Sequence, residues 1–133
     1  MLLPSIEIKV WVGKSPTRAR RTPINSKGIA KTKPANGPAT AWKAQVGLGF
    51  SSFVVAQGRA FTLGHAEGQD TVWCFDAATG KVVWKHSYPA ELGDKFFEGG
   101  TTGTPTIAGD RVFTLSRWGD VFCFEAATGK IAW

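Results

Sequence analysis

Two copies of one sequence pattern decide the fold: Thr71–Trp84 reads TVWCFDAATGKVVW, and Asp120–Trp133 reads DVFCFEAATGKIAW. Each copy opens with a short run rich in valine and aromatic residues, which is typical of a strand buried on both faces. An Ala-Ala-Thr-Gly turn follows, in which Gly80 or Gly129 can adopt the positive φ that a tight turn requires. The chain then reverses into a half-exposed strand. Each copy therefore predicts a β-hairpin.

A second pair of strands precedes each hairpin. We expect strands over Ser51–Ala56 and Arg59–Gly64, with counterparts over Thr104–Ala108 and Arg111–Ser116. Four short strands in a period of roughly 40–50 residues are typical of a β-propeller blade rather than of a sandwich. The predicted fold is therefore all-β, with two four-stranded antiparallel blades. The second blade is incomplete, since the chain stops at Trp133.

The blade pattern also sets the expected domain boundaries. Thr40–Val46 resembles the outer strand that closes each hairpin, with Trp42 in the place of Trp84 and Trp133. In chain order we expect an irregular basic leader over residues 1–39, a boundary strand over 40–46, a first blade over about 50–87 and a second blade over about 104–133.

The net charge of +6 is concentrated in the leader. Residues 1–39 hold eight basic side chains against Glu7 alone, a balance of +7, and residues 40–133 come to −1. Five of the seven prolines also lie in the leader, so we expect it to be mostly disordered. Its cluster Arg18–Arg21 could bind phosphates through charge, which makes nucleic-acid contact one alternative function. Few aromatic residues interleave with this cluster, which argues against that alternative.

No targeting signal or membrane span is predicted. The first ten residues contain Pro4, Glu7 and Lys9 where a secretory signal needs an uninterrupted apolar run, and no apolar stretch approaches spanning length. The two cysteines, Cys74 and Cys123, hold equivalent positions in the two copies. Equivalent positions in neighbouring sheets lie about 10 Å apart, so we expect no disulfide between them.

The turns and the closing tryptophans carry a family resemblance. Asp76–Trp84 resembles the pyrroloquinoline-quinone-like repeat, whose pattern is Ala-x-Asp-x-x-Thr-Gly-x-x-x-Trp, and Glu125–Trp133 is similar to it. The resemblance implies that each tryptophan docks onto the turn of a neighbouring blade, in a closed ring of roughly seven or eight blades. The positions that match the docking tryptophan and the turn are Trp42, Asp76, Thr79, Gly80, Trp84, Glu125, Thr128, Gly129 and Trp133.

Two features of the chain depart from the repeat pattern. Glu125 replaces the turn aspartate, so we expect the second turn to be held less tightly by its own side chain. Two blades also cannot close a ring, because repeat units bury their faces against one another. We therefore expect an amino-terminal fragment of a bacterial repeat protein, whose partners are its remaining blades or another protein.

The resemblance implies two functions of different classes. Enzymes with this repeat bind pyrroloquinoline quinone with calcium on the ring axis, but no residue of this chain matches their ligands and no adjacent cysteines exist. We therefore assign no catalytic, cofactor or metal residue, and expect a non-catalytic binding or scaffold module without a cofactor. The alternative is a fragment of a quinone-dependent dehydrogenase, which would use the quinone with calcium. Proteins of this family are mostly extracytoplasmic in bacteria, which implies a periplasmic or cell-envelope location.

The longest connection between predicted strands, His86–Gly103, could carry function on one rim of the blades. The candidate rim surface consists of Lys95, Glu98, Arg117, Trp118 and Asp120. The alternative is that Trp118 only covers a turn. His65 and His86 have no second ligand at metal spacing, so we expect packing or surface roles for both.

Overall fold

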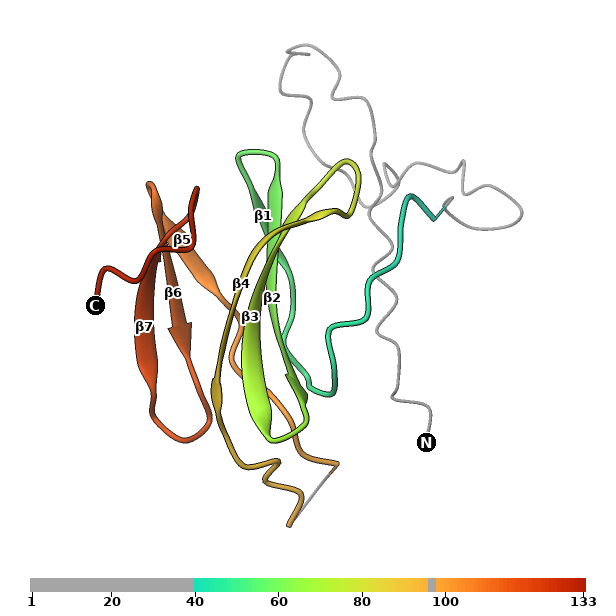
Figure 1. Cartoon of the computed structure of the whole chain (residues 1–133), viewed down its shortest axis with the longest axis vertical. Helices are drawn as coiled ribbons and strands as arrows, with labels where there is room; N and C mark the ends of the chain where they lie inside the picture. Colours follow the sequence, from blue (N-terminus) through green and yellow to red (C-terminus); the bar gives the residue numbers. More distant parts are fainter. Residues whose placement is uncertain (1–39, 96–97) are drawn as a thin grey trace, which may run out of the picture.

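The computed structural model describes residues 40–95 and 98–133, which form two antiparallel sheets side by side (Figure 1). The first sheet has the strand order β1-β2-β3-β4, and the second has the order β5-β6-β7. The strands are β1 Val54–Ala56, β2 Arg59–Ala66, β3 Gln69–Asp76, β4 Val82–Pro89, β5 Thr106–Ala108, β6 Arg111–Leu115 and β7 Val121–Glu125. The all-β fold of two blades, with the second incomplete, is confirmed.

The leader predicted over residues 1–39, including its basic cluster, lies outside the described residues. Among the residues that are described, no helix has the length and apolar character needed to cross a membrane.

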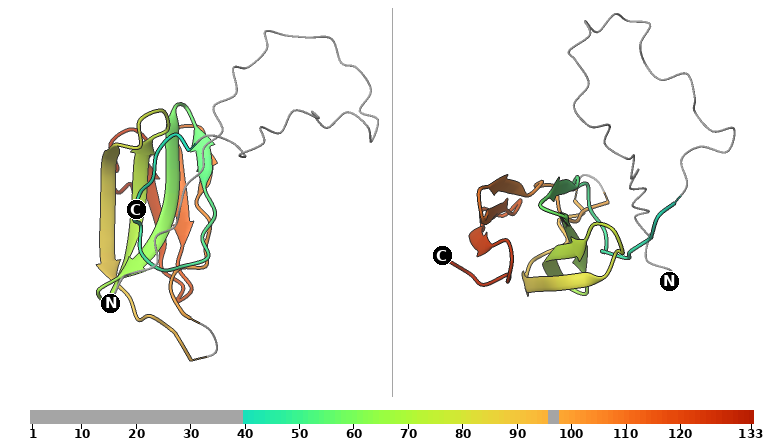
Figure 2. Two further views of the ribbon diagram at one scale, coloured as in Figure 1. Left: turned by 90° about the vertical axis from the view of Figure 1, so that its right-hand side faces the viewer. Right: turned by 90° about the horizontal axis from the view of Figure 1, so that it is seen from above.

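The strands of the first sheet are joined in sequence order. Strands β2 and β3 pair over eight residues, from Arg59 with Asp76 to Ala66 with Gln69, across a two-residue turn at Glu67 and Gly68. Both turn residues have positive φ, 51° and 74°, as this kind of hairpin requires. The strands of both sheets run along a common direction, and the second sheet lies alongside the first when viewed from above (Figure 2).

One strand prediction needs correction. The sequence predicts a boundary strand over 40–46, but the structure has no strand there, because the bridging of this part of the chain to β2 begins only at Leu48. The chain instead makes isolated bridges just afterwards, from Leu48 to His65 and from Gly49 to Thr101. In the second blade, the outer strand is present only as a bridge between Phe124 and Ile131.

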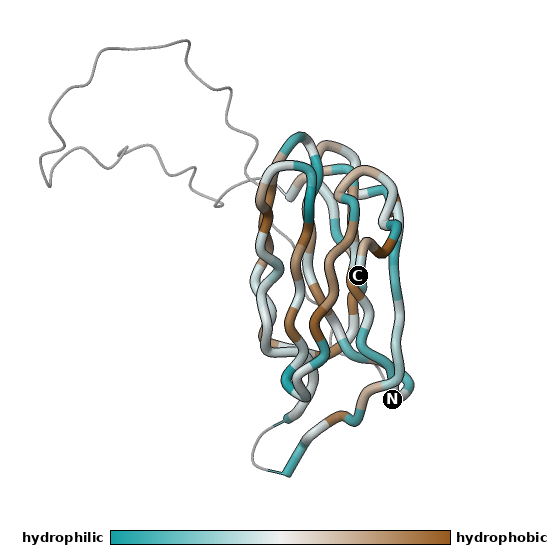
Figure 3. The backbone as a smooth tube through the Cα atoms, turned by 90° about the vertical axis from the view of Figure 1, so that its left-hand side faces the viewer, coloured by the Kyte–Doolittle hydropathy of each residue, from teal (hydrophilic) through white to brown (hydrophobic). Residues whose placement is uncertain are grey.

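The main core lies between the two sheets. Side chains from β2, β3 and β4 meet side chains from β6 and β7, so each sheet buries one face against the other. The buried members of this core are Phe61, Leu63, Val72, Cys74, Trp84, Tyr88, Val112, Phe124 and Ala126. Figure 3 shows the hydrophobic residues gathered along the strands and the hydrophilic ones at the turns. A smaller core on the opposite face of the first sheet consists of Trp42, Val46, Ala60 and Phe75.

Polar contacts from one side chain also join the sheets. The Arg59 guanidinium, at the start of β2, donates through Nη1 to the carbonyl of Ala127 at 2.7 Å and to that of Ala126 at 3.3 Å. These carbonyls belong to the turn that follows β7. The first sheet is therefore hydrogen-bonded, through Arg59, to the backbone of the turn in the second sheet.

Candidate functional site

The turn after β3 receives the indole of Trp42. Trp42 Nε1 donates a hydrogen bond to the Ala77 carbonyl at 2.9 Å, and only 8% of the residue is exposed. Gly80 has a φ of +73°, and a Cβ built on it would lie 2.5 Å from the Trp42 ring. The ring therefore occupies the space that the side chain of any other residue at position 80 would need.

The turn after β7 repeats this arrangement with Trp84. Trp84 Nε1 donates to the Ala126 carbonyl at 2.9 Å, and Gly129 has a φ of +72° with its would-be Cβ 2.5 Å from the Trp84 ring. The rings of Phe61 and Phe124 both lie within 6 Å of this ring, centre to centre. Each tryptophan thus contacts the turn of the blade that follows it in the chain.

The side chain that opens each turn differs between the blades. Asp76 Oδ1 accepts hydrogen bonds from the backbone amides of Ala78 and Thr79 and from the Thr79 hydroxyl, at 2.8 to 3.1 Å. The Thr79 hydroxyl bond, and then the amide bonds, lower the pKa of the Asp76 carboxyl. Among the described residues, the Glu125 carboxylate accepts a hydrogen bond only from the hydroxyl of Thr128, at 2.9 Å. The longer glutamate side chain therefore leaves the second turn without the amide bonds that the aspartate makes in the first.

The third tryptophan of the series is in a different environment. Trp133 is 63% exposed, whereas Trp84 is 9% exposed. Within residues 40–95 and 98–133, its ring neighbour is Phe113, with the ring centres 6.1 Å apart. Its backbone carbonyl accepts a bond from the Cys123 amide at 2.9 Å, which places it beside β7.

Two of the predicted rim residues meet the long loop. Trp118 Nε1 donates to the Glu91 carbonyl at 3.1 Å, and the Arg117 guanidinium lies 5.1 Å from the centre of the Trp118 ring. Arg117 also donates to the carbonyls of Leu92 and Gly93. Trp118 therefore connects the loop that follows β4 to the turn between β6 and β7. The two predictions for this residue, a rim surface and a cover for a turn, did not include this contact.

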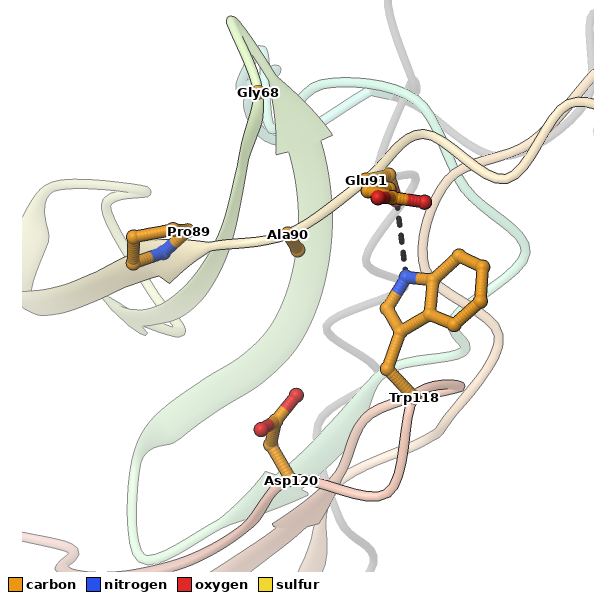
Figure 4. Close-up of a pocket in the computed structure, with 6 residues that line it drawn as sticks. All are labelled: Gly68, Pro89, Ala90, Glu91, Trp118 and Asp120. Carbon is orange, nitrogen blue, oxygen red and sulfur yellow. Dashed lines mark hydrogen bonds between the residues drawn. The ribbon is translucent and has the colours of Figure 1, made fainter.

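These contacts leave a pocket of about 610 Å³ at the rim (Figure 4). Its lining consists of Gly68, Pro89, Ala90, Glu91, Trp118 and Asp120. Of the predicted rim residues, Trp118 and Asp120 line it, whereas Lys95 and Glu98 are exposed on the loop outside the lining. Asp120 is held by Ser116, whose hydroxyl donates to Asp120 Oδ2 at 2.7 Å. The structure thus brings part of the predicted rim surface together.

Sequence reasoning missed a row of buried polar side chains across the first sheet. His65, Asp70 and Tyr88 are paired across β2, β3 and β4, and His65 Nδ1 lies 2.7 Å from Asp70 Oδ1. All three residues are buried. Burial, and then the charges of Asp70 and Asp120, raise the pKa of the Tyr88 hydroxyl. The hairpin turn at Glu67–Gly68 was the available signal, since it fixes His65 opposite Asp70.

The described residues offer no metal donor set. No group of three or more histidine, cysteine, aspartate or glutamate side chains converges in residues 40–95 and 98–133. His86 instead packs against Phe122 and Phe124 at 5.5 and 5.3 Å between ring centres, and burial lowers its pKa.

Comparison with known proteins places these elements in a family. The family model described as outer membrane protein assembly factor BamB matches residues 26–133. The chain belongs to this family. The family's repeat explains why a docked tryptophan and a glycine turn recur in both blades. No curated protein sequence matches the chain.

Solved structures show the same fold. The BamB structure from Moraxella catarrhalis matches with a TM-score of 0.54 and 21% identity, over 74% of this chain and 31% of that one. A europium-containing methanol dehydrogenase matches with a TM-score of 0.55 and 22% identity, over 74% of this chain and 19% of that one. The chain thus spans less than a third of either protein, and at these identities the likeness concerns the fold alone.

Proposed function

We propose that the chain is a non-catalytic binding or scaffold unit that packs, through the free face of its second blade, with further blades or with a protein partner. The observation that carries this proposal is the contrast between equivalent residues of the two blades. Leu63 is 1% exposed and Leu115, its counterpart, is 56% exposed. Trp84 and Trp133 differ in the same way.

The physical reason lies in what each face meets. The face of the first sheet that carries Leu63 is covered by β6 and β7, whereas in the second sheet the corresponding face is open among the described residues. The exposed apolar residues on this open face are Leu115, its pairing partner Val121, and Trp133. Contiguous apolar surface of this kind typically marks an interaction site. A further blade with the same turn would cover it as the second blade covers the first.

The proposal is tested by adding a third copy of the repeat. A copy of residues 85–133 appended after Trp133 supplies a new turn at the spacing seen between Trp84 and Gly129. We expect Trp133 emission to shift to the blue and the unfolding temperature to rise, since interfaces between repeats dominate stability. The matched control is the same extension carrying Trp133→Ser, which should show neither gain. Unchanged Trp133 emission in the extended chain would exclude docking at this face.

The nature of the partner is also a proposal. The matching family model is described as an outer membrane protein assembly factor. This supports a protein partner in the bacterial cell envelope. The test is a pull-down with purified envelope proteins that compares the chain with a Leu115→Lys and Trp133→Ser double variant. If the double variant captures the same protein equally well, this face is excluded as the binding surface.

The quinone-dependent dehydrogenase remains a second proposal, supported by the fold shared with a methanol dehydrogenase. Among residues 40–95 and 98–133, no three histidine, cysteine, aspartate or glutamate side chains converge on one point, and calcium takes six to eight oxygen ligands. The test is titration of the longest available protein with pyrroloquinoline quinone and calcium. Binding with turnover of an alcohol would support the enzyme, and neither binding nor turnover would exclude it.

Nucleic-acid contact through the basic leader is the third proposal, and it rests on the charge of residues 1–39 alone. Retention on DNA that falls with salt and disappears when residues 1–39 are deleted would support it. Retention that is unchanged by the deletion would reject it.

A further inference from the structure

The contact that joins the two blades has two halves, a tryptophan and a glycine turn. Trp84 supplies the tryptophan half from the first blade, and the turn that carries Gly129 supplies the turn half from the second blade. A further turn half lies at Gly80 in the first blade, and a further tryptophan half lies at Trp133 in the second. The two outer faces of this pair of blades therefore carry the two halves of one contact.

Trp133 is oriented on its own blade as Trp84 is. Each of these tryptophans lies beside the cysteine of the neighbouring strand in its own blade. The Trp84 ring lies 5.9 Å from the ring of Phe61, at an interplanar angle of 52°. The Trp133 ring lies 6.1 Å from the ring of Phe113, the equivalent phenylalanine, at an angle of 49°. Trp133 therefore has the orientation of a docked tryptophan while its outer side is exposed.

An arginine next to each tryptophan half gives a second, independent observation. Arg59 donates through Nη1 to the carbonyls of the two alanines in the second turn. Arg111 is its equivalent in the second blade, and its Nη1 is buried, lies 3.9 Å from Glu125 Oε1 and has no hydrogen-bond partner in the structure. A buried donor without a partner is rare. The acceptors that Arg59 has and Arg111 lacks are the backbone carbonyls of an alanine turn.

Trp42 covers the turn half of the first blade in the same way that Trp84 covers that of the second. Each indole lies 5.6 Å from a phenylalanine ring of the sheet that it covers, Phe75 or Phe124, and donates to a turn carbonyl at 2.9 Å. Trp84 belongs to β4, which pairs with β3, whereas residues 40–46 form no strand. Trp42 can therefore leave its turn without the loss of a strand ladder.

We propose that the open face of the second blade binds the first blade of a second copy of this chain. In the second copy, Trp42 leaves the turn at Gly80, and Trp133 of the first copy takes its place. Arg111 of the first copy then donates to the two alanine carbonyls of that turn. The inference rests on the proposed function, since it names the partner of the same face. The two surfaces differ, so copies join head to tail rather than as a two-fold dimer.

The strength of this association depends on Trp42. Trp42 competes for the turn from within the same chain, at an effective concentration on the order of millimolar. The unmodified chain should therefore associate only weakly with itself. Removal of the Trp42 ring makes every turn available, which should strengthen the association by about tenfold or more.

The test is sedimentation velocity of two forms of the full 133-residue chain. The acceptor form carries Trp42→Ser and Trp133→Ser, so its first turn is uncovered and it has no tryptophan to dock. The donor form is the unmodified chain. We expect a one-to-one complex in the mixture and a monomer for the acceptor form alone. A donor that carries Trp133→Ser should give no complex.

A second acceptor form allows for loss of folding. Near-ultraviolet circular dichroism shows whether the Trp42→Ser acceptor retains its packed aromatic residues. Trp42→Phe, again with Trp133→Ser, keeps an apolar ring over the turn but loses the Nε1 hydrogen bond. If the first acceptor form is unfolded, this second form takes its place, and the same results are expected at a lower affinity.

Two further donor variants test the arginine. Arg111→Gln should weaken the complex by about tenfold, because it removes a charged donor to the turn carbonyls. Lys130→Gln removes the same charge from an exposed position of the same blade and should change the affinity by less than about twofold. Equal effects of the two variants would overturn the role of Arg111.

The absence of a complex in the mixture, or a complex that the Trp133→Ser donor retains, would overturn the proposal. These outcomes are distinct from failure of the proposed function, which the appended third repeat tests. If the appended repeat covers Trp133 and the mixture stays monomeric, the face binds a blade but the second copy is excluded as its partner. If neither docks, both proposals are wrong.

Discussion

The ring of Trp42 lies against the α-carbon of Gly80, so close that a Cβ on Gly80 would be 2.5 Å from it. The two residues are 38 positions apart, and the Trp42 Nε1 bond to the Ala77 carbonyl fixes the ring in this place. Two separate constraints therefore favour glycine at position 80. It adopts a φ of +73°, and it leaves room for an indole from the preceding segment.

These two reasons can be separated by experiment. Gly58 has the same φ of +73° but no atom within 4 Å of a would-be Cβ. We expect Gly58→Ala to lower the free energy of unfolding by about 1 kcal/mol, from backbone strain alone. Gly80→Ala should lower it by about 3 kcal/mol, because Trp42 must also move. Urea unfolding of both variants measures the difference, and equal losses would show that the ring contact has no energetic weight.

The two later tryptophans should differ in their contribution to stability. Trp84→Phe removes the indole hydrogen bond to the Ala126 carbonyl, which keeps only the longer bond from Arg59, and opens space between the sheets, so we expect a loss of about 2 to 3 kcal/mol. Trp133→Phe should cost less than about 0.5 kcal/mol, since most of this side chain is exposed. Chemical denaturation of the two variants checks this. A large effect at position 133 would mean that this ring is already docked in solution.

The second turn should be improved by giving it the side chain of the first. Glu125→Asp shortens the side chain so that its carboxylate can accept from the turn amides, as Asp76 does. We expect the free energy of unfolding to rise by about 0.5 to 1 kcal/mol. The reverse change, Asp76→Glu, is the matched control and should lower it. Loss of stability in Glu125→Asp would contradict this account of the turn.

The turn aspartate should also contribute to acid sensitivity. The hydrogen bonds from Thr79 lower the pKa of Asp76 in the folded state, so the unfolded state takes up a proton first. The contribution of Asp76 is therefore full above about pH 4 and is lost as the pH falls through its folded pKa. The measurement is the stability difference between the chain and Asp76→Asn at a series of pH values. It should shrink below about pH 4, and a constant difference would contradict the assignment.

A buried thiol should give the opposite dependence at high pH. Burial raises the pKa of Cys74 from 9.0 to about 11, and the folded chain holds this cysteine as a free thiol. Between these values the unfolded state loses its proton before the folded state does, so stability falls as the pH rises. Unfolding curves from pH 8 to 11 should show less of this fall in Cys74→Ala. An identical fall in the variant would assign the effect to other groups.

Local sequence was sufficient for the seven strands that the structure contains and for the turns between them. Valine and aromatic runs, each followed by an Ala-Ala-Thr-Gly turn, specify hairpins because glycine alone adopts positive φ without cost and because a short run between turns has no other way to bury its side chains. The repeat spacing then indicated blades, and the family match agrees. The turn that begins at Glu125 could be recognised as the weaker one from the sequence. The length of the side chain determines which backbone amides of the turn its carboxylate can reach.

Contacts between distant segments needed the tertiary structure. The segment 40–46 has the composition of an outer strand, yet a strand forms only where another lies beside it, and composition does not supply that neighbour. The pocket likewise arises because Trp118 reaches the Glu91 carbonyl, 27 residues away, and so brings a loop of one blade onto a turn of the next. The sequence by itself determined the hairpins and their repeat. Only the packing of the two sheets decided which polar groups lie buried between them, since burial depends on the facing surface rather than on the strand that carries the residue.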